Sequence, residues 1–554
     1  MKNNKVLKYV LIYLAITLIA FLSYYITLPA LNPCSVGFWI YLAFLIFIYT
    51  APFSLKFSKK SVVVVKGKNK LTKDLPFDMK SNKLIFIAVV PLLVALIGGI
   101  ISSQLFNAKK YASVIEIKEC VFEDDMPETV NVTNIALMDT PSAQILGNKT
   151  LGSLSEVVSQ YGISENYNQI NYQNLPKKVA NLEYGDFFKW IGNRSKGVPG
   201  YVLVDPVLEN KAEYVKLSKP MKYVESAYFG EDLYRKLRFD YPTKILGDPR
   251  YEIDDNGNPV YIVQCLKPQV GLFGAMDVVE AIIFDPCTGE SQLIKNIEDV
   301  PEWVDTVFDG DLACEKYNWF GTLSGGYFNS IIGQKGCKVT TDDFGYLTLD
   351  NDVWYFTGVT SVTAEDESNI GFILSNARTG EYKYYPVIGS AEKAAMGSAE
   401  GEVQFQGYKA SFPSLINVQG EATYIMVLKD DNGLVKLYAL VNVEQFGVVA
   451  TGTDQQQAMN AYKKLLVEKG LIDSSSAADN LKEINVLSVK QTVIDGNTVF
   501  FYEVNDGGNT VYYKLSIADD ERALFITAGD TILVNATEST QGIYNITYWE
   551  FKNA

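Results

Sequence analysis

The sequence predicts an α-helical membrane anchor of three transmembrane helices followed by extracytoplasmic domains of α+β, β-rich architecture. Three observations support this fold class. Three long apolar segments lie within residues 1–106, the remaining residues are strongly acidic, and short apolar runs there alternate with Gly, Asn and Asp turns. Such short runs between turn residues are typical of strands. About 450 residues outside the membrane exceed what one hydrophobic core serves, so several domains are expected.

The three apolar segments are Val10–Leu31, Val36–Leu55 and Leu84–Phe106. A helix needs about 20 apolar residues to cross the hydrocarbon core of a bilayer, and each segment is long enough. A cleavable signal peptide is the alternative for the first segment. Its apolar run is too long for that, and no small-x-small cleavage site follows it. We therefore expect three retained membrane helices.

The placement of lysines predicts the orientation. The N-terminus and the loop 56–83 hold all twelve lysines of residues 1–106, whereas the turn Asn32–Ser35 carries no charge. Short, positively charged loops stay in the cytoplasm. Lys109 and Lys110, after the third segment, are a weaker signal in the opposite direction. We expect a plasma-membrane protein with a cytoplasmic N-terminus and with residues 107–554 extracytoplasmic; the loop then serves as a topology anchor, or alternatively as the output of a sensor.

The two parts of the chain differ sharply in charge. Residues 1–106 carry a net charge of +10, whereas the remainder carries −25. So acidic a domain is repelled by nucleic acid, which argues against a nucleic-acid partner.

The chain contains no histidine. This excludes Ser-His-Asp and Cys-His catalysis and His-ligated metal sites, and we expect no cofactor. Of the six cysteines, none forms a Cys-x-x-Cys pair. An oxidising exterior permits one or two disulfides, and the four cysteines between Cys265 and Cys337 are the best placed to form them.

Five regions are expected, and a Ser/Ala-rich linker precedes the last of them. They are the transmembrane region 1–106 with its cytoplasmic loop 56–83, an α+β segment 107–198, two α+β repeats over 199–345, a third sheet-rich unit over 346–470 and a small barrel over 481–554.

An internal repeat supports this division. The segment Tyr201–Pro206 recurs about 80 residues later as Ala281–Pro286, and Gly371–Glu381 is a weaker third copy. Each copy predicts a strand, a tight turn, a second strand and a short helix. The turn needs a residue that adopts positive φ, which explains its glycine.

A strand that ends in Asp-x-x-Thr-Gly-Glu, as in Phe284–Glu290, resembles the PepSY module, a small α+β unit of bacterial envelope proteins and protease propeptides. The second match, Leu374–Glu381, departs from the pattern because Asn376 replaces the Asp. The resemblance covers only these short motifs. It implies a binding or inhibitory role and carries no catalytic residues.

The C-terminal region reads as six short strands, which predicts a small closed barrel of OB type. The strands are expected at Val486–Ile494, Thr498–Val504, Thr510–Ile517, Ala523–Ile526, Thr531–Val534 and Ile543–Phe551. Before it, a capping box of Thr453 and Gln456 predicts the start of a helix that Gly470 ends. Its apolar face is expected to be core.

The densest group of carboxylates is Glu298, Asp299, Glu302 and Asp305 around Trp303. An indole ring can stack on a sugar, so Glu302, Trp303 and Asp305 are the candidate ligand contacts. The alternative, which we favour, is an acidic surface beside a buried Trp.

Small residues four apart occur in the third apolar segment, as Gly98 with Ser102 and Gly99 with Ser103. Such pairs allow close packing, which we expect within the chain rather than between chains.

Taken together, these patterns favour a membrane-anchored binding or scaffold protein of the cell envelope, without enzymatic activity. Its expected partners are the lipid bilayer and an envelope protein or a cell-wall glycan. The alternative is an envelope hydrolase that uses a pair of carboxylates, as in glycoside cleavage.

Overall fold

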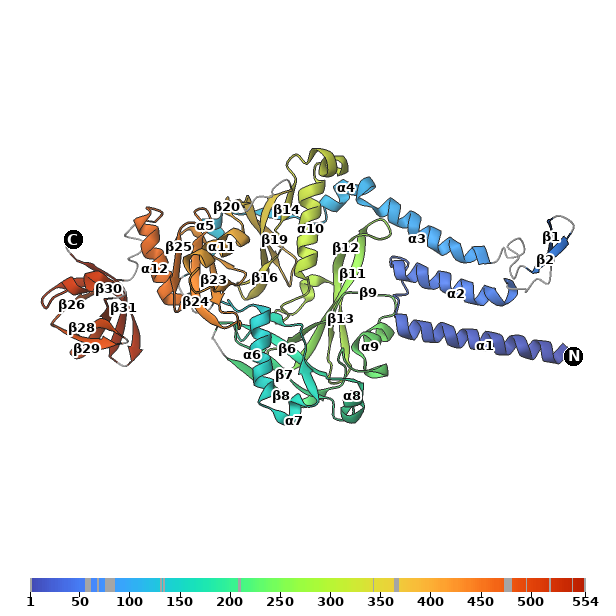
Figure 1. The fold of residues 1–554 in the computed structure, drawn as a ribbon, viewed down its shortest axis with the longest axis horizontal. Coiled ribbons are helices and arrows are strands. Elements are labelled where there is room, and N and C mark those ends of the chain that lie inside the picture. Colours follow the sequence, from blue (N-terminus) through green and yellow to red (C-terminus); the bar gives the residue numbers. More distant parts are fainter. Residues whose placement is uncertain are drawn as a thin grey trace. The chain divides into compact units, whose positions relative to one another are not determined.

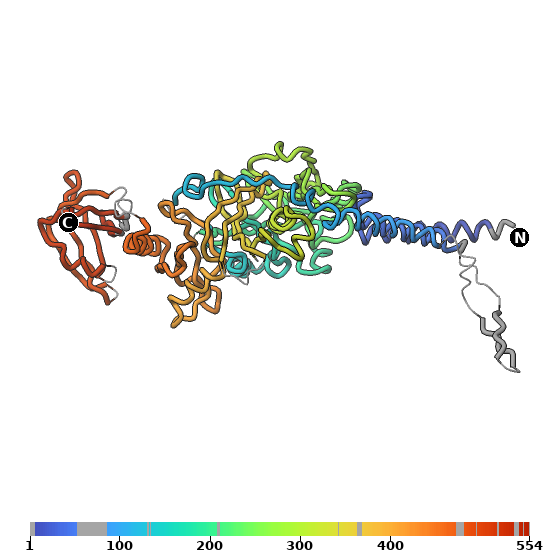
Figure 2. The backbone as a smooth tube through the Cα atoms, turned by 90° about the horizontal axis from the view of Figure 1, so that it is seen from above, coloured from blue at the N-terminus to red at the C-terminus, as the bar shows by residue number. Residues whose placement is uncertain are grey.

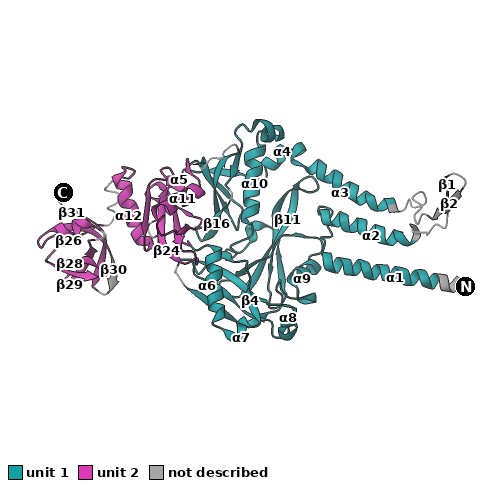
Figure 3. Cartoon of the chain, viewed as in Figure 1, with its two compact units in different colours: residues 1–120, 138–386 teal, residues 121–137, 387–554 magenta. Residues whose placement is uncertain are grey.

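The chain forms two compact units, residues 1–120 with 138–386 and residues 121–137 with 387–554 (Figure 3). The computed structural model describes residues 2–54, 61–66, 69–74, 85–129, 132, 135–207, 211–341, 343–362, 368–472, 481–494, 496–517, 520–540 and 542–552. Of the expected loop 56–83, it describes only the antiparallel strands β1 (Ser61–Lys66) and β2 (Asn69–Asp74); the rest of that loop lies outside the described residues.

The apolar segments form helices in unit 1. These are α1 (Lys2–Thr27), α2 (Val36–Ser54) and α3 (Val89–Ser102), which run side by side (Figures 1 and 2). Within α1, Val6–Thr27 is long and apolar enough to cross a membrane. The apolar helix Val36–Pro52 is shorter, and α3 reaches that length only together with the bent helix that follows it.

The third apolar segment is bent rather than one straight helix. After a 3₁₀ turn (Ile85–Ala88) and α3, Ser103 adopts an extended conformation, and α4 (Gln104–Ala112) leaves at an angle of 53°. Polar side chains satisfy the carbonyls exposed at the break, which allows the helix to end there. The Ser103 hydroxyl donates to the Ile100 carbonyl at 2.7 Å, and the Asn107 amide donates to the Ile101 carbonyl at 2.6 Å.

Two of the small residues of the third apolar segment, Gly98 and Ser102, pack against a β-hairpin. A Cβ added at Gly98 would lie 2.9 Å from side-chain atoms of both Leu272 and Phe273. The Ser102 hydroxyl accepts the backbone N–H groups of these same two residues, at 2.7 and 3.3 Å. The packing within the chain is thus with the tip of the hairpin of β11 and β12, and Gly99 has no neighbour within 4 Å of an added Cβ.

Four sheets share one antiparallel plan. In each sheet, two short strands pair with the same long strand. On its other side this strand pairs with a second long strand, and a final strand pairs with the second. The first sheet is β4 (Tyr161–Ile163), β5 (Asn168–Tyr172), β6 (Leu175–Tyr184), β7 (Val198–Val204) and β8 (Ala212–Met221). The second is β9 (Ile245–Leu246), β10 (Arg250–Ile253), β11 (Pro259–Val270), β12 (Gly274–Phe284) and β13 (Ser291–Ile294). The third is β14 (Lys338–Thr340), β15 (Gly345–Leu349), β16 (Asp352–Ser361), β18 (Gly371–Asn376) and β19 (Tyr382–Tyr385), to which β3 (Ile117–Glu119) adds a parallel edge. The fourth, in unit 2, is β21 (Lys409–Ala410), β22 (Ser414–Val418), β23 (Glu421–Lys429), β24 (Val435–Asn442) and β25 (Val449–Gly452).

A helix precedes each of these sheets in the sequence (Figure 1). These helices are α6 (Thr140–Gly152), α9 (Leu233–Asp240), α10 (Gly310–Leu323) and α11 (Glu392–Glu402). The remaining short helices are α5 (Phe122–Asp125), α7 (Ser155–Val158) and α8 (Phe187–Asn193).

An Asp or Asn follows or ends the second long strand of every sheet and closes the next turn. The side chains of Asp205, Asp285, Asn376 and Asn442 each accept a backbone N–H from two or three residues further on. Asn376 makes the same pair of bonds as Asp285 because a carboxamide oxygen accepts as a carboxylate oxygen does. The sequence difference at this position therefore leaves the turn unchanged.

Helix α12 (Gln455–Glu468) begins one residue later than the capping box predicted. Asp454 is the N-cap, and its carboxylate accepts the N–H of Gln457 at 2.8 Å. A carboxylate serves this role better than the Thr453 hydroxyl because it also interacts with the helix dipole. Gly470 ends the helix with φ +71°, and the expected apolar face is buried at Ala458, Met459, Tyr462 and Leu466.

The C-terminal sheet has the order β26-β30-β31-β29-β28-β27. Its strands are β26 (Lys482–Asn485), β27 (Ser488–Ile494), β28 (Asn497–Asp506), β29 (Asn509–Ser516), β30 (Thr531–Thr540) and β31 (Ile543–Phe551). The strand expected at Ala523–Ile526 is wrong: Glu521–Phe525 is a 3₁₀ helix, because the Asp520 side chain caps it by accepting the N–H of Arg522. β26 was not expected.

The expected disulfides are absent, since none joins any of the cysteines, all of which lie in the described residues. The four cysteines from Cys265 to Cys337 are held by separate elements. Cys265 lies within β11, Cys287 in the turn after β12, Cys314 in α10 and Cys337 before β14. The Cys287 thiol contacts the Lys219 carbonyl at 3.1 Å, and the Cys337 thiol contacts that of Thr322 at 3.5 Å.

Candidate functional site

A pocket of about 460 Å³ lies where the end of α1 meets the first sheet and α9. We call it the α1 pocket. It is lined by aromatic side chains, by carboxylates and by one guanidinium group. The aromatic residues are Tyr25, Tyr184, Tyr228 and Phe229; the charged residues are Asp186, Glu225, Asp232 and Arg235.

Two of the carboxylates are positioned by helix capping. Asp186 precedes α8, and its side chain accepts the N–H of Lys189 at 2.9 Å. Asp232 precedes α9 and accepts the N–H of Arg235 at 2.8 Å. An N-cap carboxylate is a local requirement of the helix. These two groups are therefore fixed at the pocket wall by the folding of α8 and α9.

Glu225 differs from them, because no hydrogen bond or ion pair of its carboxylate occurs in the described part of the chain. Its neighbour Ser226 fixes the segment: the Ser226 N–H donates to Glu183 at 2.8 Å, and its hydroxyl accepts the N–H of Tyr184 at 2.8 Å. Burial raises the pKa of Glu225 to about 7, and the negative charges of Glu183 and Asp248 add to this. At neutral pH, the pocket thus contains a carboxyl group that is partly protonated.

Arg235 connects α1 to the pocket. Its Nε donates to the Tyr25 carbonyl at 3.2 Å, and one of its terminal nitrogens donates to the Phe229 carbonyl at 2.7 Å. The guanidinium group also lies 4.3 Å from the centroid of the Tyr25 ring, a favourable cation–π contact. The last turn of α1 is therefore part of the pocket wall.

A second pair of carboxylates, Glu252 and Asp305, is buried away from solvent, at 0 % and 5 % exposure. Glu252 accepts the N–H groups of Asp305 at 3.0 Å and of Thr306 at 2.8 Å. Burial raises the pKa of Asp305 to about 7, and burial together with the Asp305 charge raises that of Glu252 well above its ordinary value. This pair is internal.

The structure does not bring the three predicted ligand contacts to one surface. Glu302 is exposed, Trp303 is half-buried against the core cluster that includes Val304 and Phe308, and Asp305 is buried. The alternative, an acidic surface beside a buried Trp, agrees with the exposure of Glu302 and with the packing of Trp303 on the core, but not with the burial of Asp305.

The α1 pocket has no sequence motif, because its carboxylates are spread over 186–232. The one available signal was the aspartate before each short helix, since Asp186 and Asp232 are both N-caps.

In the described residues, no group of three or more Cys, Asp or Glu side chains is arranged to hold a metal ion.

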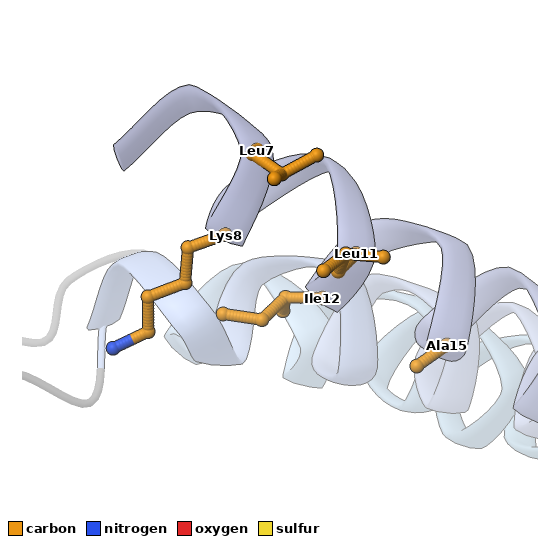
Figure 4. A pocket seen from close by; sticks show the side chains of 5 residues that line it. All are labelled: Leu7, Lys8, Leu11, Ile12 and Ala15. Carbon is orange, nitrogen blue, oxygen red and sulfur yellow. The ribbon is translucent and has the colours of Figure 1, made fainter. Parts of the chain in front are cut away.

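A second, shallow hollow of about 390 Å³ lies on α1 itself, and Figure 4 shows that all its lining side chains come from that one helix. They are Leu7, Lys8, Leu11, Ile12 and Ala15. Lys8 is the one charged side chain of this lining, and the other four are apolar, so the hollow has too few polar groups to orient a specific ligand.

Fold and site define a class only in broad terms: a β-rich protein of several sheets, with one N-terminal helix long and apolar enough to cross a membrane. No family model matches the chain, and no curated protein does. Among solved structures, it matches an exo-1,5-alpha-L-arabinanase from a bovine ruminal metagenomic library at 12% identity. The match covers 54% of this chain and 96% of that one with a TM-score of 0.13, too low to support any argument.

Proposed function

We propose that this chain is a membrane-anchored binding protein of the cell envelope and that its α1 pocket binds a cell-wall glycan. The observation that carries the proposal is the lining of the pocket, in which aromatic rings lie together with Glu225, a half-buried carboxylate without a described partner. Sugars present apolar C–H faces, which pack on aromatic rings, and hydroxyl groups, which donate to carboxylates. A concave site with a few polar groups is what such a ligand requires.

In this proposal, α1 is one span, α2 is a second and the bent segment of α3 and α4 is a third. The lysines of the N-terminus and of the loop 56–83 then lie in the cytoplasm. Residues 107–554, which supply most of the lining of the α1 pocket, lie outside the cell in contact with the wall.

We also assign the four sheets to PepSY-like repeats and the C-terminal sheet to an OB-like barrel. The assignment to repeats is supported by the shared plan of the sheets and by the matching turns at Asp285 and Asn376. The second assignment is supported by the strand order and by the parallel pairing of β29 with β31. Only Val486 and Leu487 separate β26 from β27, the two edges of that sheet, so one bent strand serves both edges.

The test is binding of the full-length protein, in detergent micelles, to soluble glycan strands released from purified cell wall. Tyr228→Ala removes an aromatic wall of the pocket and is expected to weaken binding roughly tenfold. Glu302→Gln, at an exposed site outside the pocket, is the control and leaves binding unchanged. Loss of binding in the control alone would place the glycan at the acidic segment around Trp303. Absence of any binding by the wild type would overturn the proposal.

The second candidate function is an envelope hydrolase, which the raised pKa of Glu225 favours, because a general acid must hold its proton near neutral pH. Asp232 and Asp186 line the same pocket and are the available partner carboxylates. Release of new reducing ends from the glycan strands, lost in Glu225→Gln, would support this reaction. Binding without release supports the binding function alone.

A further inference from the structure

We propose that exposed apolar side chains on α8 and at the end of α9 insert into the headgroup region of the bilayer that α1 crosses. We call them the interfacial patch. It consists of Phe188, Ile191 and Phe239, whose exposed fractions are 81%, 50% and 44%. The inference rests on the membrane anchoring proposed above and adds a second attachment to it.

Ring contacts through Phe187 connect Phe188 to the aromatic wall of the α1 pocket. Phe187 lies between Phe188, at 5.8 Å, and Tyr228, at 4.9 Å, measured between ring centroids. It also lies 6.4 Å from Phe229. Large contiguous apolar areas are uncommon on soluble surfaces and mark contact sites.

The patch is continuous with the apolar surface of α1. The Phe239 ring lies 5.8 Å from that of Tyr24 and 6.1 Å from that of Tyr25, in the last turns of α1. Next to them, Ile26 is 72% exposed and lines the α1 pocket together with Tyr228 and Phe229. An apolar surface thus runs from the membrane helix onto the end of α9, and the α1 pocket with its charged groups lies beside it.

The chain just after α1 is bonded to the chain just after α9, which fixes this arrangement. The Leu31 N–H donates to the Pro242 carbonyl at 2.7 Å, and the Asn32 side chain donates to the Thr243 carbonyl at 2.9 Å. Figure 1 shows α9 against the end of α1. Because α1 leaves the hydrocarbon near Thr27, the patch lies at the depth of the headgroups.

The continuity with α1 identifies a lipid surface as the occupant, and basic residues lie next to the patch. Phe187–Lys196 contains Lys189, Arg194 and Lys196 and no acidic residue. Lys189 pairs with Asp186 at 3.8 Å and Arg194 pairs with Glu231 at 3.3 Å, and the Arg194 side chain, 54% exposed, lies 4.9 Å from the Trp190 ring. Aromatic rings together with lysines and arginines are typical of the membrane–water interface, where the cations meet anionic headgroups.

The test is photo-crosslinking of the full-length protein in vesicles of phosphatidylglycerol and phosphatidylethanolamine. Benzoylphenylalanine replaces Phe188 in one variant. In the matched control it replaces Ile145, an exposed side chain of α6, a helix that Figure 1 shows on the side of unit 1 away from α1. A third variant carries it at Leu14, within the proposed span. Mass spectrometry measures the lipid adducts.

We expect lipid adducts at position 188 to exceed those at position 145 roughly tenfold. Adducts at position 14 but none at position 188, or protein adducts at position 188, would overturn the inference and leave the membrane anchor intact. Lack of adducts at position 14 would instead overturn the anchor itself, and with it the inference.

Discussion

The backbone N–H of Asn171 donates to the Asp305 carboxylate at 2.9 Å, which joins the hairpin of β5 and β6 to the segment before α10. The Asn171 side chain also donates to the Asn351 carbonyl at 2.8 Å, next to β16 of the third sheet. Since Glu252 of β10 accepts the N–H of Asp305, this one aspartate lies where the first three sheets of unit 1 meet. A residue that the sequence presents as a candidate ligand contact is thus an internal connector.

The first prediction concerns the pH dependence of stability. The pKa of Asp305 is raised from its ordinary 3.8 to about 7, so the folded chain binds more protons than the unfolded chain between these values. Stability is therefore expected to fall as pH rises through this window, by up to about 1.4 kcal/mol per pH unit.

Asp305→Asn stays neutral and keeps an acceptor for the Asn171 N–H, so it should make this slope smaller, while the raised pKa of the buried Glu252 leaves a remaining slope of the same sign. Unfolding by urea, followed at several pH values from 4 to 8, checks the slope of wild type against variant. Equal slopes would mean that Asp305 is ionised throughout.

The second prediction concerns the contact of α3 with the β-hairpin. Gly98→Ala places a methyl group 2.9 Å from Leu272 and Phe273 and is expected to lower the free energy of unfolding by about 1–3 kcal/mol. Gly99→Ala meets no atom within 4 Å and is the matched control, with no loss expected. Thermal unfolding in detergent micelles measures both variants. A similar loss in the two variants would point to the helix itself rather than to the hairpin contact.

The third prediction concerns the turn after β12. Asp285→Asn should be tolerated, because Asn376 already makes the equivalent bonds, at 2.9 Å to each of Arg378 and Thr379. Asp285→Ala leaves the N–H groups of Cys287 and Thr288 without their acceptor and should cost about 1–2 kcal/mol. Chemical denaturation of the two variants and the wild type measures the loss in the free energy of unfolding for each substitution. Equal losses would show that the negative charge, and not the acceptor, matters.

Features encoded in short sequence windows were predictable. The apolar run of α1, the turn glycines Gly289 and Gly380 and the buried face of α12 all follow from local patterns. The bend at Ser103 was not, because it depends on how Asn107 satisfies carbonyls one turn earlier. Nor was the α1 pocket, since Glu225 acquires its environment from Glu183 and Asp248, which are distant in sequence.

The contact between Ser102 and the hairpin tip has a mechanical consequence. One hydroxyl at the end of α3 holds the backbone of Leu272 and Phe273, and from there β11 and β12 run as paired strands into the second sheet. These paired strands connect the end of α3 directly to the interior of unit 1. Any tilt of α3 must either break the two bonds at Ser102 or displace the sheet that holds Cys265 and its neighbours.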